Sequence, residues 1–190
     1  MAKQVAIFAS GSGSNAENII KHFENNPDVN IKLVLCNKKD AFVLTRAKNL
    51  GIPSIVFSKK EMEEGNVLEI LRKEQIDFIV LAGFLLKVPA ELVAAYPDRI
   101  VNIHPALLPN YGGKGMYGMK VHEAVVAAHE RESGITIHYV NEFFDSGTII
   151  FQARCEVLPT DTPEDVAQKV HKLEYAHFPQ VIESVVSKLS

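Results

Sequence analysis

The sequence has 190 residues, 47% of them hydrophobic and 23% charged, with a net charge of −3 at pH 7. This length predicts one domain, residues 1–190, with a well-buried core, and the mild acidity argues against nucleic acid as a partner. Cys36 and Cys155 belong to no Cys-x-x-Cys or Cys/His cluster, and no run resembles a signal peptide or a bilayer span. These features argue against a disulfide framework, a metal site and a membrane partner, and they favour a cytoplasmic protein.

Strand and helix patterns alternate along the chain in the manner of βαβ units. Continuous apolar runs predict buried strands at residues 5–9, 31–36, 52–57, 77–81, 100–103, 135–140 and 148–157. Periodic apolar residues predict helices at about 14–25, 41–50, 61–75, 89–96 and 121–129, and from 163 almost to Ser190, with a break or kink at Pro179. The loop 141–147 is too short for a crossover helix, so the last two strands should be antiparallel. The expected fold is α/β: a single doubly wound, mostly parallel sheet with an antiparallel C-terminal part.

A glycine-serine loop, Ser10-Gly11-Ser12-Gly13-Ser14-Asn15, follows the first predicted strand. Its glycines let the backbone turn sharply, and the amides of Gly13, Ser14 and Asn15 would lie at a helix N-terminus, where they can bind a phosphate. The side chains of Ser14 and Asn15 add further donors. A plain glycine turn, in which Ser14 or Asn15 caps the helix, fits the same pattern about equally well.

The same loop satisfies a relaxed dinucleotide-binding fingerprint, Gly11-x-Gly13-x-x-Ala16. In an NAD site, a carboxylate after the second strand would bind the ribose. Here that strand is followed by Asn37-Lys38-Lys39. The loop therefore favours a phosphomonoester over a dinucleotide.

Asn102 and His104 stand at the end of a predicted strand, which Pro105 prevents from continuing. Because they are two residues apart, their side chains point to the same side and together could stabilise a developing oxyanion. A histidine beside a proline is more often structural, so the pair needs a further partner. Asp145 would supply it by orienting His104 and raising the pKa of its imidazole, although an aspartate before Ser-Gly equally fits a plain turn.

The other histidines show no convincing metal-ligand spacing. His138 shares a strand face with Thr136 and is expected to be a hydrogen-bonded core or supporting residue. The remaining histidines fall in helical patterns and are expected at the surface or in packing: His22, His122, His129, His171 and His177.

The apolar run 80–89 exceeds the length of a strand and leaves four apolar residues in a strand-to-helix connection. Most such residues belong to a core, but an apolar loop beside a strand end can also bind a flat aromatic ligand. These residues are Phe84, Leu85, Leu86 and Val88. Further along, the glycine-rich segment 111–118 carries no periodic pattern and is expected to be a mobile loop.

With these residues in view, the chain resembles the phosphoribosylglycinamide formyltransferases, a folate-dependent family of purine biosynthesis. The resemblance covers nearly the whole chain. Its most specific motif is the Asn-x-His-Pro-x-Leu-Leu-Pro run from Asn102 to Pro109, which is supported by four further segments: 10–15, 81–84, 112–118 and 145–147. Ala106 replaces a common serine, and Leu85-Leu86 stands where some relatives have methionine and arginine.

This resemblance implies a formyltransferase fold with a phosphate-binding half at about 1–100 and a catalytic, folate-binding half at about 101–190. Asn102, His104 and Asp145 would be catalytic. The acceptor's phosphate would bind to Gly13, Ser14 and Asn15, and Glu174 would bind its ribose hydroxyls. The folate would lie against the apolar connection named above and the loop from Val140 to Asp145.

The implied reaction transfers the formyl group of 10-formyltetrahydrofolate, a co-substrate, to the amine of glycinamide ribonucleotide, with no metal. The amine attacks the formyl carbon directly. Asn102 and a protonated His104 stabilise the tetrahedral oxyanion, while Asp145 and an ordered water help to move the proton from the amine to the leaving nitrogen.

Three other functions compete with this one. A formyltetrahydrofolate hydrolase would carry an N-terminal regulatory domain, whereas the first strand begins at once. A methionyl-tRNA formyltransferase would need a C-terminal domain and a basic surface for tRNA. A non-catalytic nucleotide-binding module would use the first loop alone. For the transferase, small molecules are the expected partners, and the chain is expected to be a monomer or a homodimer.

Overall fold

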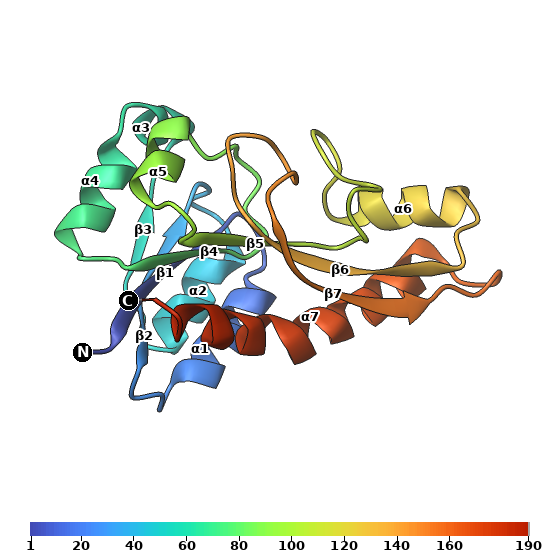
Figure 1. Cartoon of the computed structure of the whole chain (residues 1–190), viewed down its shortest axis with the longest axis horizontal. Helices are drawn as coiled ribbons and strands as arrows, with labels where there is room; N and C mark the ends of the chain where they lie inside the picture. Colours follow the sequence, from blue (N-terminus) through green and yellow to red (C-terminus); the bar gives the residue numbers. More distant parts are fainter. Residues whose placement is uncertain (190) are drawn as a thin grey trace.

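The computed structural model describes residues 1–189; Ser190, the last residue of the predicted domain, lies outside the described residues. Within residues 1–189 the strands form one seven-stranded sheet of order β3-β2-β1-β4-β5-β6-β7 (Figure 1). The strands are β1 Lys3–Ala9, β2 Val29–Cys36, β3 Ser54–Val56, β4 Phe78–Leu81, β5 Ile100–His104, β6 Glu132–Tyr139 and β7 Ile149–Glu156. β1 to β5 pair in parallel, while β6 runs antiparallel to β5 and to β7. The predicted fold class is confirmed.

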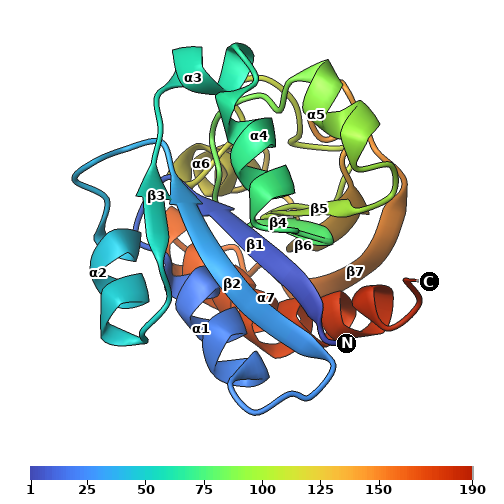
Figure 2. The same cartoon turned by 90° about the vertical axis from the view of Figure 1, so that its left-hand side faces the viewer.

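Helices cover both faces of the parallel part of the sheet (Figure 2). They are α1 Ser14–Phe23, α2 Phe42–Asn49, α3 Lys59–Glu63, α4 Asn66–Lys73, α5 Ala90–Ala95, α6 Met119–Ala127 and α7 Pro163–Val186. Side chains of β1 alternate between the faces: Val5 and Ile7 pack with α1, α2 and α7, whereas Ala6 and Phe8 pack with α3, α4 and α5. Burial on both faces explains why the parallel strands read as unbroken apolar runs.

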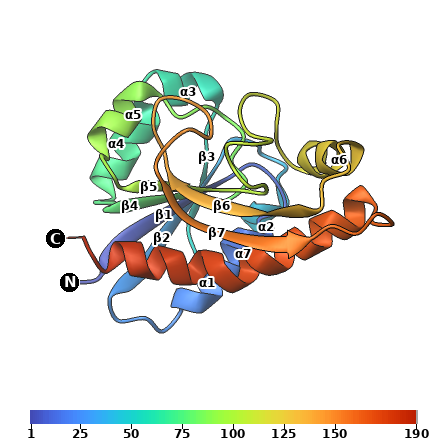
Figure 3. The ribbon, with the colours of Figure 1, turned by 45° about the vertical axis from the view of Figure 1, so that its right-hand side comes forward.

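One predicted helix is divided in two, and a break considered at Pro179 does not occur, each for an identifiable reason. The expected helix 61–75 is two helices, because Gly65 adopts a left-handed conformation (φ 88°) between α3 and α4. The expected break at Pro179 is absent, and α7 is continuous through it (Figure 3). Pro179 cannot donate to the carbonyl four residues earlier, at Tyr175, but the Asn18 side chain of α1 donates to that oxygen at 3.0 Å. A neighbouring helix thus satisfies the group that the proline leaves free.

The C-terminal part of the fold brings distant polar residues to one place. In the antiparallel pairing of β5 with β6, Asn102 lies opposite His138 and His104 opposite Thr136. α7 runs beneath β6 and β7 and along α1, so it reaches from the C-terminal part of the sheet to the first loop (Figure 3). Within residues 1–189, no helix has both the length and the apolarity that crossing a bilayer requires.

Candidate active site

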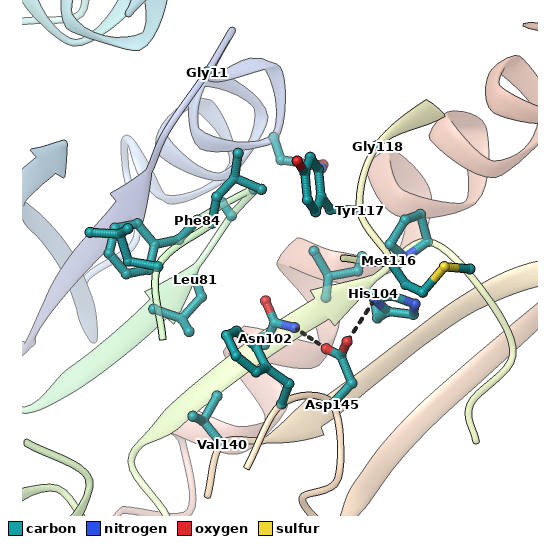
Figure 4. Close-up of a pocket in the computed structure, with 18 of the residues that line it drawn as sticks. Gly11, Leu81, Phe84, Asn102, His104, Met116, Tyr117, Gly118, Val140 and Asp145 are labelled. Atoms are coloured by element: carbon teal, nitrogen blue, oxygen red, sulfur yellow. Dashed lines mark hydrogen bonds and ion pairs between the residues drawn. The ribbon is translucent and has the colours of Figure 1, made fainter. Parts of the chain in front are cut away.

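The carboxyl ends of β1, β4 and β5 open into one cavity of about 700 Å³. Its lining includes all three predicted groups of residues: the first loop, the residues around β5, and the apolar connection after β4. The glycine-rich loop 112–118 forms another part of the wall, and its Tyr117 is labelled beside the cavity in Figure 4. The four segments therefore meet in one cavity although they are far apart in sequence.

Asp145 lies between Asn102 and His104 at the floor of this cavity (Figure 4). Its Oδ2 is 3.4 Å from His104 Nδ1, and its Oδ1 is 3.5 Å from Asn102 Nδ2. The side chains of Asp145 and His104 are only 11% and 5% exposed. The N–H of Gly113 donates to Asp145 Oδ2 at 2.9 Å, so the glycine-rich loop fixes the carboxylate. Asp145 is thus more than a turn former.

The hydrogen bonds of His104 define where its proton sits. Its Nε2 is 2.7 Å from the carbonyl oxygen of Tyr111, which can only accept, so Nε2 carries hydrogen. In the neutral imidazole, Nδ1 is therefore the nitrogen that can accept a proton. Burial lowers the pKa of His104 below its ordinary value, against the opposing effects of Asp145 and the Tyr111 carbonyl. Asp145 raises this pKa, as expected, but desolvation has the larger effect.

His138 holds the side chain of Asn102 in place. Its Nδ1 is 2.8 Å from the carbonyl oxygen of Tyr139 and so donates, which leaves Nε2 to accept from Asn102 Nδ2 at 3.1 Å. Burial raises the pKa of Asp145, but contacts with His138, His104 and the Gly113 N–H outweigh it, and the pKa lies below its usual value. Asp145 is therefore ionised at neutral pH.

The first loop presents unpaired backbone N–H groups at the start of α1. Gly13, not Ser14 or Asn15, is the N-cap residue; it is left-handed (φ 73°), and no side chain caps the helix, so that predicted alternative is wrong. The first intrahelical bond runs from the N–H of Glu17 to the carbonyl of Gly13. The N–H groups before it have no helical partner and are available to an anion.

The side chain of Asn15 contacts a second predicted site residue. Its Nδ2 donates one hydrogen bond to Glu174 Oε2 at 3.0 Å, so this amide orients Glu174. His171 Nδ1 lies 2.9 Å from the same carboxylate oxygen, and this hydrogen bond raises the pKa of His171. Glu174 is buried and lines the cavity next to the loop.

The expectation that His122 and His171 are only surface or packing residues is wrong, because both line the cavity. His122 is 2% exposed, and its Nδ1 is buried without a hydrogen-bond partner. The spacing of His171 and Glu174, three residues apart on one helix, could have indicated that His171 lies beside a site residue. No comparable signal marks His122.

Apolar side chains form the opposite part of the cavity wall. The predicted residues Phe84, Leu85, Leu86, Val88 and Val140 all line it. Two aromatic residues of the predicted loop from Val140 to Asp145 also line it, Phe143 and Phe144, which are 63% and 40% exposed. Among residues 1–189, no group of three or more His, Cys, Asp or Glu side chains is placed to hold a metal ion.

Comparison with known proteins identifies the family of this chain. The sequence pattern of the formyl transferase family matches residues 3–182. The chain belongs to the formyl transferase family. It is 39% identical over 190 residues to phosphoribosylglycinamide formyltransferase of Bacillus subtilis, with 97% of this chain and 95% of that protein covered. It is 42% identical to the chloroplastic phosphoribosylglycinamide formyltransferase of Arabidopsis thaliana, with 96% of this chain and 65% of that protein covered.

Solved structures of formyl transferase family members share the fold. The crystal structure of phosphoribosylglycinamide formyltransferase from Bacillus halodurans superposes with a TM-score of 0.88 at 38% identity, covering 98% of this chain and 96% of that one. The corresponding protein of Anaplasma phagocytophilum gives a TM-score of 0.89 at 32% identity, covering 98% and 88%. The chain spans 65% and 61% of the length of the two plant relatives it matches.

Proposed function

We propose that the protein transfers the formyl group of 10-formyltetrahydrofolate to the amine of glycinamide ribonucleotide. In this assignment, the N–H groups of Gly13 and Ser14, with that of Asn15, bind the phosphate, and Glu174 binds the ribose hydroxyls. Asn102, His104 and Asp145 act on the reacting groups. The names and identities of the relatives support the proposal.

The observation that carries the proposal is the convergence of two chemistries in one cavity. One end offers unpaired N–H groups at a helix N-terminus, which suit a phosphate. The other end holds a buried imidazole beside an ionised carboxylate, which suits proton transfer. Glu174 lines the same cavity, where it is hydrogen-bonded to Asn15 of the loop, and its carboxylate suits hydroxyl groups. An acceptor that carries a phosphate, a ribose and an amine would match the N–H groups, the Glu174 carboxylate and the proton-transfer pair.

The first chemical step would be attack of the acceptor amine on the formyl carbon. A carbon–nitrogen bond forms, and the electrons of the carbonyl move to its oxygen. Asn102 Nδ2 can stabilise that oxyanion, because its contact with Asp145 is long at 3.5 Å and leaves this hydrogen weakly engaged. His138 holds the other amide hydrogen and so fixes the direction of the donor.

The second step would move one proton. His104 rests in the neutral form, because its pKa is lowered, and its Nδ1 accepts the proton that the amine loses. The resulting imidazolium is paired with Asp145, and in this form it also stabilises the oxyanion. The protonated His104 that the family resemblance implies is thus formed during the reaction. The proton then passes to the leaving nitrogen, whose bond to the formyl carbon breaks to give tetrahydrofolate and the formylated amine.

The apolar wall would hold the heterocycle of the formyl donor. Phe84 packs edge-on against Phe8, with ring centroids 5.3 Å apart, so its position is set by the core. Leu85 and Phe144 are each 40% exposed and offer apolar surface to a flat ligand. The donor would thereby place its formyl group next to β5.

Release of tetrahydrofolate, followed by absorbance, tests the proposal. We expect release from 10-formyltetrahydrofolate only when glycinamide ribonucleotide is present, with formation of the formylated acceptor. Release in water alone would instead identify a hydrolase, and tight nucleotide binding without turnover would identify a binding module. Either result would refute the transferase assignment.

A further inference from the structure

Arg46, on α2, contacts the first loop from the side opposite the cavity. Its Nε donates to the carbonyl oxygen of Ser12 at 2.9 Å. One turn earlier on the same helix, the N–H of Val43 donates to the carbonyl oxygen of Gly11 at 3.1 Å. Neither Arg46 nor Val43 lines the cavity, whereas Gly11 and Ser12 do. α2 therefore holds two consecutive carbonyl groups of the loop on its outer side.

This anchoring determines where the loop's N–H groups point. In a trans peptide unit the C=O and the following N–H point in opposite directions. With the carbonyls of Gly11 and Ser12 turned toward α2, the N–H groups of Ser12 and Gly13 are turned away from α2, toward the cavity. A Cβ on Gly13 would lie 2.7 Å from Val43 Cα, so loop and helix are in direct contact. The N–H of Gly13, one of the three assigned to the phosphate, is thus given its direction by α2.

The position of Arg46 is itself fixed on two sides. Its Nη1 forms an ion pair with Glu17, in the first turn of α1. Its guanidinium lies over the ring of Phe42, 4.9 Å from the centroid. The planar guanidinium thus bridges the loop and the helix that follows the loop. Glu17 has a second, exposed partner in Lys21, which does not touch the loop.

We propose that Arg46 is a positioning residue for phosphate binding: through the Ser12 carbonyl and Glu17, it holds the loop's N–H groups toward the phosphate of the acceptor. This inference rests on the proposed function, which supplies the phosphorylated acceptor. An ordinary surface ion pair would contribute little to either stability or binding. The distinguishing feature of Arg46 is its bond to a backbone carbonyl of the binding loop.

The test compares Arg46→Met and Arg46→Lys with Lys21→Ala, the matched control that removes the other partner of Glu17. The affinity of each variant for inorganic phosphate is measured by following the amide ¹⁵N–¹H signals of Ser12, Gly13 and Ser14. We expect the dissociation constant to rise about tenfold in Arg46→Met and to stay within about twofold in Lys21→Ala. Arg46→Lys keeps the charge but lacks the planar guanidinium with its several N–H donors, so it should recover only part of the lost phosphate affinity.

Kinetics provide the second measurement, with the acceptor and its dephosphorylated ribonucleoside as paired substrates. We expect Arg46→Met to raise KM much more than it lowers kcat, and to reduce the preference for the phosphorylated acceptor about tenfold. Unchanged phosphate affinity, equal loss on both acceptors, or full recovery in Arg46→Lys would overturn the inference. Phosphate titration needs no formyl donor, so a wild-type protein that binds phosphate but transfers no formyl group would refute only the proposed function.

Discussion

Replacing Gly13 by alanine should destabilise the protein through two separate effects. The backbone at Gly13 has φ 73°, a region that costs an L-residue about 1–2 kcal/mol. The added Cβ would also lie 2.4 Å from Val43 Cγ2 and 2.7 Å from Val43 Cα, and the second contact is with backbone, which cannot rotate away. Overpacking of this kind costs about 1–3 kcal/mol, so the expected loss of unfolding free energy is about 2–5 kcal/mol.

Gly51→Ala is the matched control, because Gly51 has nearly the same φ, 70°, but nothing within 4 Å of its added Cβ. It should lose only the backbone contribution, about 1–2 kcal/mol. Urea denaturation followed by circular dichroism measures both variants. If Gly13→Ala and Gly51→Ala lose the same unfolding free energy, the close approach of the loop to Val43 contributes nothing and the reasoning is refuted. Gly13→Ala should in addition weaken phosphate binding, which Gly51→Ala should leave intact.

Three further predictions concern residues that line the cavity. Asn102→Ala should lower kcat by about two to three orders of magnitude, as expected for loss of an oxyanion donor, and near-normal turnover would exclude that role. Asp145→Asn should lower the pKa of His104 further, since the carboxylate raises it, and an imidazole NMR titration showing no decrease would contradict the pairing. Because burial lowers the pKa of both His104 and His122, the unfolded chain binds more protons than the folded one, and the unfolding free energy should fall as the pH drops below about 6.5. His171 has a raised pKa and so stabilises the fold at acid pH, a contribution that is lost as the pH rises through its folded-state pKa. His122→Leu should reduce the decrease in unfolding free energy below about pH 6.5. An unchanged decrease in urea titrations would count against burial of a neutral His122.

The sheet was largely predictable because its strands are buried on both faces. An unbroken apolar run such as that of β1 admits few other structures, and the short loop before β7 dictated antiparallel pairing. The split between α3 and α4 was harder to predict. Gly65 interrupts an otherwise helical pattern, and because a single glycine is tolerated in many helices, its presence alone did not predict the left-handed conformation that separates α3 from α4.

The residues of the site were predictable only in part. The alternation of a strand places Asn102 and His104 on one side, but nothing local brings Asp145 to them. Its position depends on the fold of the loop after β6, where Asp145 itself has φ 50°. The raising effect of Asp145 on the pKa of His104 was predictable, but the net lowering was not, because a sequence shows the charge of a partner and not the extent of burial. His122 was missed because one buried imidazole on a helix has no distinguishing spacing.

The bond between Asn15 and Glu174 joins residues 159 positions apart, near the two ends of the sequence. During synthesis, the loop and the β5 residues leave the ribosome long before α7 does, so Glu174 is the last of the proposed site residues to emerge. Under the proposed function, the acceptor can bind only after the last helix has docked against the first. Its binding then favours that docked state by mass action, so the acceptor should slow unfolding that begins with release of α7. Under the proposed function, binding of the acceptor therefore depends on the completed folding of the C-terminal helix.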